Sequence, residues 1–438
     1  MVLRLRRALP GSAARIRLLL LTVAFAGTAA CSVGAQGADP ELLTRARAIH
    51  DRVITLDTHV DINPNNFQPA ESNYVTGLST QVDLPKLEQG GLDAVFFSIY
   101  QGQRQDFTPE GYQAAHDLAI AKIEAIHRLT SDLAPDRIGL AVTADEVRRI
   151  AASGRKVALM GMENGYAIGE DITNVEKFAD LGVRYLSLAH NGNNQLSDSN
   201  NGQPDGARHG GLSPLGRQVV AEANRWGIML DISHPSKLAN LQTIELSRAP
   251  VMASHSSARA LADHTRNLDD EELRAVQRNG GVVQVVAFPS YLKVSEPSPE
   301  RQQALAQLRE SFGLPESGGV NSALQALTPD RRAEYERQRD EIDERLPPPP
   351  PANVSDLVDH VDYIVDLIGI DHVGISSDFD GGGGVEGWDD ATETFNVTLE
   401  LVRRGYTEDE IAQIWSGNLL RVMTEVERVA AEIQRSEA

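Results

Sequence analysis

The chain has 438 residues, of which 41% are hydrophobic, and this is enough to bury a large core. Such a core fits either two ordinary domains or one large α/β barrel with insertions. The formal net charge of −21 argues against nucleic acid or an anionic membrane surface as a partner, because both repel an acidic protein.

The first residues are typical of an exported protein. Residues 1–30 contain five arginines and no acidic residue, and an apolar run occupies residues 18–30. A basic start, a short apolar stretch and small residues after it indicate a secretory signal peptide. The run is shorter than the ~20 residues that span a bilayer.

The only cysteine, Cys31, follows this run at the position where a bacterial lipoprotein signal carries its acylated cysteine. We therefore expect either a lipid anchor at Cys31 or cleavage after Ala30 or Ala35 to give a soluble enzyme. In both cases the chain is exported, to the bacterial periplasm, the cell envelope or the medium. A single cysteine also excludes a disulfide within the chain.

Eight short β-rich runs, each followed by a segment with helical spacing, divide the rest of the chain. The runs are residues 53–61, 92–100, 157–164, 183–191, 228–234, 250–256, 281–289 and 372–380. Strand and helix alternating eight times predicts a (β/α)8 TIM-type barrel over about residues 40–430. The alternative is a doubly wound open sheet, but no G-x-G-x-x-G motif follows the first strand to support it.

Residues 298–351 interrupt this alternation between the seventh strand and the last helix. They contain a charged helical segment, RRAEYERQRDEIDERL, followed by five consecutive prolines, which favour a stiff and extended connector. We interpret this segment as a surface insertion without a catalytic role.

Polar side chains fall at the carboxyl ends of six of the eight predicted strands, where barrels of this kind build their active sites. They are His59, Asp61, Glu163, His190, His234, His255 and Asp378. Each of them alone could cap a turn or a helix. Four of only eleven histidines at equivalent strand ends, with three carboxylates beside them, indicate a converging site.

Imidazole and carboxylate groups without a thiolate suit Zn²⁺ or a neighbouring borderline metal. Even five of these seven side chains are too many ligands for one tetrahedral zinc ion that keeps an open position. Two ions that share a bridging carboxylate use the ligands economically, and such a pair can activate a water as a nucleophile at neutral pH. The sequence therefore predicts two Zn²⁺ ions per chain.

Several motifs occur in order between Val53 and Val422: DTHVD, GMENG, YLSLAHN, DISH, SHSSAR, RNLDD and DHVGISSDFDG. In this order they resemble the membrane (renal-type) dipeptidases of the amidohydrolase superfamily. The resemblance implies that His59, Asp61 and a bridging Glu163 hold one zinc ion. It implies that Glu163, His234 and His255 hold the other.

The same resemblance implies that His190 polarises the scissile carbonyl, Arg266 binds the free carboxylate of the substrate, and Asp378 transfers a proton. The implied reaction is attack of a metal-bridging hydroxide on a dipeptide, which releases the C-terminal residue, D-residues included. An alternative for Arg266 is an ion pair with Asp269 or Asp270.

Two other functions stay open at this point. The same site could hydrolyse a lactam, a lactone or an N-acyl amino acid, because a fold does not determine its substrate. The chain could also be an exported metal-binding protein that has lost catalysis, although the presence of both Asp378 and His190 argues against this. The oligomeric state is left open, with a homodimer among the candidates.

Overall fold

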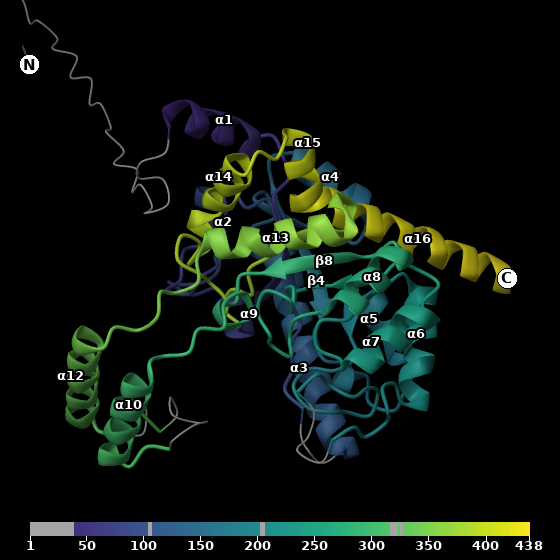
Figure 1. Ribbon diagram of the computed structural model, residues 1–438. Helices are drawn as coiled ribbons and strands as arrows, with labels where there is room; N and C mark the ends of the chain where they lie inside the picture. Colours follow the sequence, from purple (N-terminus) through teal and green to yellow (C-terminus); the bar gives the residue numbers. More distant parts are fainter. Residues whose placement is uncertain (1–38, 104–106, 202–205, 316–322, 325–326) are drawn as a thin grey trace, which may run out of the picture.

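The structure is a computed structural model that describes residues 39–103, 107–201, 206–315, 323–324 and 327–438 (Figure 1). The predicted signal peptide at residues 1–30 and the predicted anchor at Cys31 lie outside the described residues. Within the described ranges, no helix has the length and apolar content that a membrane crossing needs.

Parallel strands form one sheet that curves into a nearly closed barrel, so the predicted (β/α)8 TIM-type barrel is confirmed. The barrel strands are, in order around the sheet, β1 (Leu56–Asp61), β2 (Ala94–Ser98), β4 (Lys156–Met162), β5 (Val183–Ser187), β6 (Met229–Asp231), β7 (Met252–Ala253), β8 (Val282–Val286) and β9 (Val373–Ser376). Seven of them fall within the predicted runs, and β4 begins one residue before its run, at Lys156. The two edges meet where Asp61 N donates to Phe379 O at 2.9 Å and Asp378 N donates to His59 O at 3.1 Å.

One strand was not predicted. β3 (Ile138–Leu140) pairs in parallel with the first residues of β4, from Lys156 to Ala158, while β5 pairs with β4 only from Met160 onward. β3 therefore extends the sheet outside the barrel and leaves the order of the barrel strands unchanged.

Helices connect the strands and surround the barrel (Figure 1). Their bounds are α1 (Pro40–His50), α2 (Leu84–Gly90), α3 (Pro109–Arg128), α4 (Ala144–Ala152), α5 (Asn174–Asp180), α6 (Pro214–Trp226), α7 (Lys237–Leu246), α8 (Asp270–Asn279), α9 (Pro289–Leu292), α10 (Pro299–Phe312), α12 (Pro329–Arg345), α13 (Val354–Ile368), α14 (Phe395–Arg403), α15 (Glu408–Ala412) and α16 (Asn418–Glu437).

Local sequence explains where these elements begin and end. Strands such as β2 and β8 are buried along their whole length, as expected for a parallel sheet covered by helices. Asp269 starts α8 with a capping box to Glu272, which satisfies free N–H groups of the first turn. Gly227 and Gly280 end α6 and α8 with positive φ angles of 73° and 79°, which glycine adopts without strain.

The segment predicted as an insertion contains two helices, α10 and α12, which lie at the lower left of Figure 1 and are joined to the barrel by extended chain. The pair has its own small apolar core, which includes Leu308, Tyr335 and Ile342. Arg301 Nη2 donates to Asp343 Oδ1 at 2.7 Å and joins the two helices. This segment lies between β8, the seventh barrel strand, and α13, the helix that precedes the eighth barrel strand, β9. Helices α14, α15 and α16 follow β9, so α13 is not the last helix of the chain.

Candidate metal centre and active site

The carboxyl end of the barrel gathers all seven strand-end side chains that were predicted. His59 and Asp61 belong to β1, and the others follow the ends of β4, β5, β6, β7 and β9: Glu163, His190, His234, His255 and Asp378. The backbone contact between β1 and the turn after β9 closes the ring, so that side chains from both ends of the sheet face the same space.

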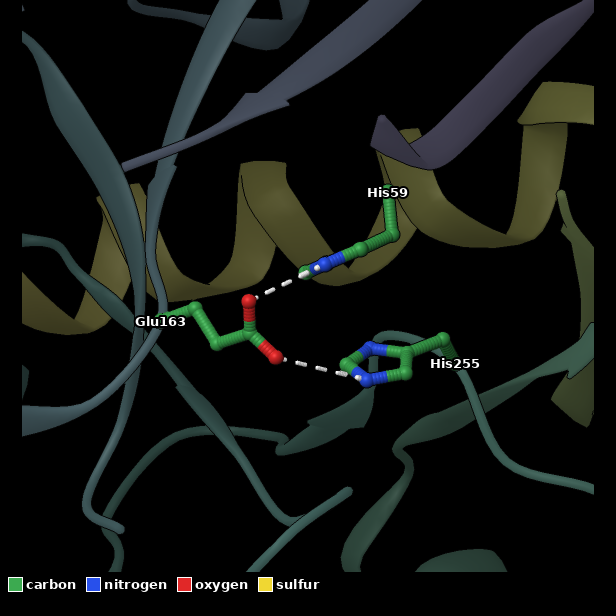
Figure 2. A group of neighbouring side chains, drawn as sticks. All are labelled: His59, Glu163 and His255. Atoms are coloured by element: carbon green, nitrogen blue, oxygen red, sulfur yellow. Dashed lines mark ion pairs between the residues drawn. The ribbon is translucent and has the colours of Figure 1, made fainter. Parts of the chain in front are cut away.

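Glu163 lies at the centre of this cluster, and Figure 2 shows it between two of the imidazoles. Its Oε2 atom lies 3.2 Å from Nε2 of His59, and its Oε1 atom lies 2.9 Å from Nε2 of His234. The Nε2 atoms of His190 and His255 lie 3.4 and 3.6 Å from the same Oε1. One carboxylate thus lies close to four imidazoles, as expected for a group that two ions share.

The other two carboxylates approach from the β1 side. Asp61 Oδ2 and Asp378 Oδ1 lie 3.7 and 3.9 Å from Nε2 of His59. Ligand atoms lie within 4.8 Å of one another in three groups: His59, Glu163 and His255; Glu163, His190 and His234; and His59, Asp61 and Asp378. Two residues expected to act on the substrate, His190 and Asp378, thus lie among the candidate ligands.

The donor set fits bound cations. The buried Nε2 atom of His59 has no hydrogen-bond partner among the described residues, although it points at Glu163. The Nε2 atoms of His234 and His255 lie only 2.9 Å apart, and two neutral imidazoles in contact there can share a single proton. Nitrogen lone pairs and carboxylate oxygens that converge on one place are the arrangement that a metal ion satisfies.

Two of these histidines are held in orientation by a hydrogen-bond partner at Nδ1, the ring nitrogen that faces away from Glu163. Nδ1 of His59 lies 2.8 Å from the hydroxyl of Tyr185, which is fully buried. Nδ1 of His255 lies 2.7 Å from Ser254 Oγ, which donates to Asp231 Oδ2 at 2.7 Å. Partners at Nδ1 direct Nε2 toward the centre of the cluster, and such partners support metal binding through histidine.

Burial and mutual charge set the protonation of the cluster. Burial acts to raise the pKa of Glu163, but the neighbouring His59 and His190 hold that pKa well below its usual value. Burial lowers the pKa of His234 and of His255 well below the usual range. The protein therefore favours an ionised carboxylate and neutral imidazoles at these positions, which are the forms that bind cations.

His59 and Asp378 behave differently. Burial would lower the pKa of His59, but Tyr185 and Glu163 raise it well above its usual value, so a cation at Nε2 has to displace a proton. Burial raises the pKa of Asp378 to about 8, and the carboxylates of Asp61 and Glu163 add to the rise while His59 opposes it.

Arg266 has no acidic partner in the described part of the chain, which removes the alternative of a structural ion pair. Asp269 binds Lys237 instead, at 2.5 Å, and Asp270 binds Arg274 at 3.3 Å. Arg266 is buried beside His234 and His255, the two cluster residues that follow β6 and β7.

The guanidinium of Arg266 contacts neutral groups only. It donates to Ser233 O, and Nη2 lies 3.0 Å from Nε2 of His234 and 3.4 Å from His255 O. Its carbon also lies 5.4 Å from the centre of the Tyr291 ring. Arg266 also lines the cavity over the cluster.

A cavity of about 750 Å³ opens over the cluster at this end of the barrel. Its wall includes Asp61, Tyr100, Lys122, Arg266, Tyr291 and Asp378. The volume is ample for a small peptide, and both apolar and polar side chains line the cavity, as in sites for small molecules.

Sequence reasoning missed three contributors to this region. Tyr185 lies within a quoted motif, but its contact with His59 depends on how two barrel strands face each other across the interior. Asp231 precedes His234 by three residues, and that spacing could have been noticed. Lys122 lies on α3, where a lysine among buried alanines and isoleucines was a detectable signal.

Comparison with known proteins agrees with this geometry. A sequence model of the family described as membrane dipeptidase, peptidase family M19, matches residues 43–437. Dipeptidase aclJ of Aspergillus oryzae is 31% identical over 358 residues, which are 81% of this chain and 72% of that protein. Dipeptidase tcpJ of Claviceps purpurea is 32% identical over 372 residues, 84% of this chain and 73% of that protein.

Solved structures with the same fold include a probable dipeptidase, PvdM, from Pseudomonas aeruginosa. It is 35% identical, with a TM-score of 0.76 that covers 90% of this chain and 100% of that one. A metallopeptidase from Rhodobacter sphaeroides, bound to a phosphinate mimic of the dipeptide L-Ala-D-Ala, is 25% identical, with a TM-score of 0.64. That likeness covers 85% of this chain and 99% of the metallopeptidase.

Proposed function

The chain belongs to the membrane dipeptidase family, peptidase family M19, and we propose from this premise that it hydrolyses dipeptides with two zinc ions at the Glu163 cluster. The observation that carries the proposal is the approach of four imidazoles to one buried carboxylate, beside a guanidinium that has no acidic partner in the described ranges. When bound, two such ions supply an acidified water, with a pKa moved from ~15.7 toward ~7, and polarise a carbonyl.

We propose the division of ligands that the family resemblance implies. His59, Asp61 and Glu163 would hold one ion, and Glu163, His234 and His255 the other. Glu163 supports this sharing because its two oxygens face different histidines, Oε2 toward His59 and Oε1 toward His234.

His190 and Asp378 would act on the substrate. The His190 side chain is 18% exposed, more than the other three imidazoles, and its ring lies 4.7 Å from that of Tyr100 in the cavity wall. It can donate its N–H to the carbonyl oxygen as negative charge develops there. Asp378 follows β9, on the side of the barrel opposite β5 and His190. Its carboxylate can accept a proton from the attacking water and deliver it to the departing amine.

Arg266 would bind the C-terminal carboxylate and so limit the enzyme to short substrates. Because the guanidinium lies close to His234, we expect one residue to separate the bound carboxylate from the metal centre. Only the last peptide bond then reaches the activated water. We also propose that the C-terminal residue can be a D-residue, which agrees with the L-Ala-D-Ala mimic bound to the Rhodobacter sphaeroides relative.

The experiment combines metal analysis with a substrate panel. The purified protein should bind close to two zinc ions per chain and hydrolyse L-L and L-D dipeptides. It should leave tripeptides and dipeptide amides intact. A single ion with full activity would contradict the shared centre. Faster hydrolysis of lactones, lactams or N-acyl amino acids than of any dipeptide would favour the other reactions open to this scaffold.

Arg266→Ala tests the carboxylate contact. Loss of hydrogen bonds to a charged group, each about 1.5–3 kcal/mol, should lower kcat/KM for dipeptides roughly a hundredfold or more while both metals stay bound. Arg259→Ala is the matched control, because Arg259 is a nearby surface arginine paired with Asp263 at 2.8 Å. If Arg266→Ala cleaves dipeptides at the rate of the Arg259→Ala control, the carboxylate does not bind there.

A further inference from the structure

A lysine lies on the buried face of α3, in the wall of the catalytic cavity. The helix turns its apolar side inward through residues that recur at helical spacing: Ala115, Ala119, Ile123 and Ile126. Lys122 falls on the same side and is only 6% exposed. Lysine is rarely buried to this extent unless it is paired, since its charge loses hydration.

The ammonium of Lys122 is unpaired in the part of the chain that the structure describes. It forms no hydrogen bond or ion pair there, and the contact that it does make is a distant one, 5.5 Å from the centre of the Tyr100 ring. Burial lowers the pKa of Lys122, whereas Asp61 and Glu163 favour its charged form from a distance. A buried amine in the cavity wall without a partner among the described residues is placed to meet a group that the substrate supplies.

The charges of the cavity wall indicate the sign of that group. The described wall carries four carboxylates: Asp61, Glu163, Asp378 and Asp380. The two divalent ions proposed above would balance these four charges. The cationic side chains Arg266 and Lys122 then remain, and neither has an acidic partner among the described residues.

These two cations enter the cavity from opposite walls. Lys122 lies on the helix that follows β2, and Arg266 lies in the segment that follows β7. In the order of the sheet, β2 and β7 are half-way around the barrel from each other. Lys122 lies beside Tyr100, which contacts His190, whereas Arg266 contacts His234.

We propose that Lys122 binds a side-chain carboxylate on the N-terminal residue of the substrate, so that the enzyme prefers dipeptides that begin with Glu or Asp. The inference rests on the proposed function. With the C-terminal carboxylate at Arg266 and the scissile carbonyl at the metal centre, the N-terminal residue extends toward the wall that carries Lys122. An acidic side chain there forms an ion pair in a largely desolvated place, where such a pair is stronger than at the surface.

The test uses two peptides that differ in charge and hardly in shape, Glu-Ala and Gln-Ala. Wild-type enzyme loaded with zinc should show a kcat/KM for Glu-Ala about tenfold or more above that for Gln-Ala, the discrimination expected of a hydrogen bond to a charged group. Lys122→Met keeps the length of the side chain and removes the charge. In this variant the ratio of the two kcat/KM values should fall toward one, mainly through KM for Glu-Ala. Lys122→Gln should do the same.

The matched control is Lys177→Met, which removes one positive charge from an exposed site on α5, where Lys177 lies 3.5 Å from Asp171. It should leave the ratio at the wild-type value. A wild-type ratio near one, or a ratio that Lys122→Met and Lys122→Gln leave unchanged while both rates fall together, overturns the inference and assigns Lys122 a structural role.

Failure of the proposed function is distinguishable from failure of this inference. If neither peptide is hydrolysed by wild type, dipeptidase activity toward these peptides is absent. The charge preference is then measured by calorimetry, with both peptides titrated into zinc-loaded protein that carries Asp378→Asn. Equal affinities for Glu-Ala and Gln-Ala overturn the role of Lys122. Tighter binding of Glu-Ala that Lys122→Met abolishes supports it.

Discussion

Replacing Tyr185 by Phe would test whether the phenol hydroxyl of Tyr185 orients the imidazole of His59 for metal binding. The phenol lies 2.8 Å from Nδ1 of His59, and the ring packs 5.3 Å from that of Phe96. Phe keeps the ring and removes the hydroxyl alone. If Nε2 of His59 binds a cation, Nδ1 must carry the proton and donate it, so the variant leaves a buried donor without an acceptor.

The expected cost follows from that one lost contact. A buried donor left unsatisfied costs about 1–3 kcal/mol, which is the desolvation of the group. Because the metal-free imidazole can move its proton to Nε2 whereas a bound cation keeps the proton at Nδ1, most of this cost should appear in metal affinity, as a decrease of roughly 10–100-fold. Gly161→Ala should act in the same direction, since a Cβ at Gly161 would lie 1.9 Å from Cζ of the Tyr185 ring and displace it.

The assay is competition for zinc against a chelator, with thermal unfolding of the metal-free protein measured in parallel. Tyr335→Phe is the control, because Tyr335 is buried within the helix pair of the insertion, away from the cavity. Tyr185→Phe with wild-type zinc affinity and wild-type kcat would refute the idea that the phenol orients His59. A loss of thermal stability without any change in zinc affinity would make Tyr185 a packing residue only.

Three further outcomes are expected. Glu163→Gln should lose zinc and activity together, because the amide removes the charge that four imidazoles share; a variant with a full zinc content by elemental analysis would contradict this. Asp378→Asn should keep most of its zinc while kcat falls by ~10²–10⁴, as for a lost general acid and base, and loss of both ions would make Asp378 a ligand. Burial lowers the pKa of His50, which is hydrogen-bonded to Thr398 and Gly90, below the usual 6.5, so the unfolded chain takes up its proton more readily than the folded protein does. The contribution of neutral His50 to stability is therefore complete above pH 6.5 and is lost as the pH falls toward the lowered pKa. His50→Gln should weaken the pH dependence of the free energy of unfolding between about pH 7.5 and 5.5, as measured by denaturant titration. An unchanged pH dependence would contradict the assignment.

The strands and the polar groups at their ends could be predicted because both depend on local periodicity. In a strand, residues two apart point to the same side, which is why His59 and Asp61 could be placed together before any fold was known. The same rule fails for very short strands. Ile138–Leu140 has only three residues and pairs with the start of one neighbour, so no alternation distinguishes it from a loop.

Groups that enter the cavity from outside the strands were not predictable in the same way. The position of Lys122 depends on how α3 packs against the barrel, which a helical pattern alone does not define. The distances between the side chains around Glu163 could not be predicted from the sequence pattern either. That Glu163 lies between His59 and His234, with one oxygen toward each, results from the curvature of the whole sheet.

The turn after β9 shows a constraint that lies in the sequence but becomes meaningful only in three dimensions. Asp378 and Asp380 have φ angles of 59° and 61°, in the left-handed region where side chains other than glycine are strained. A Cβ at Gly381 would lie 2.3 Å from an oxygen of Asp378 and 2.3 Å from one of Asp61, so only glycine lets these two carboxylates approach each other. Two carboxylates in one buried place repel each other, and burial with such neighbours is what raises the pKa of Asp378 to about 8. The repulsion between these carboxylates is relieved either by a proton on Asp378 or by cations, and cations bound among His59, Asp61 and Glu163 would let Asp378 ionise at a lower pH.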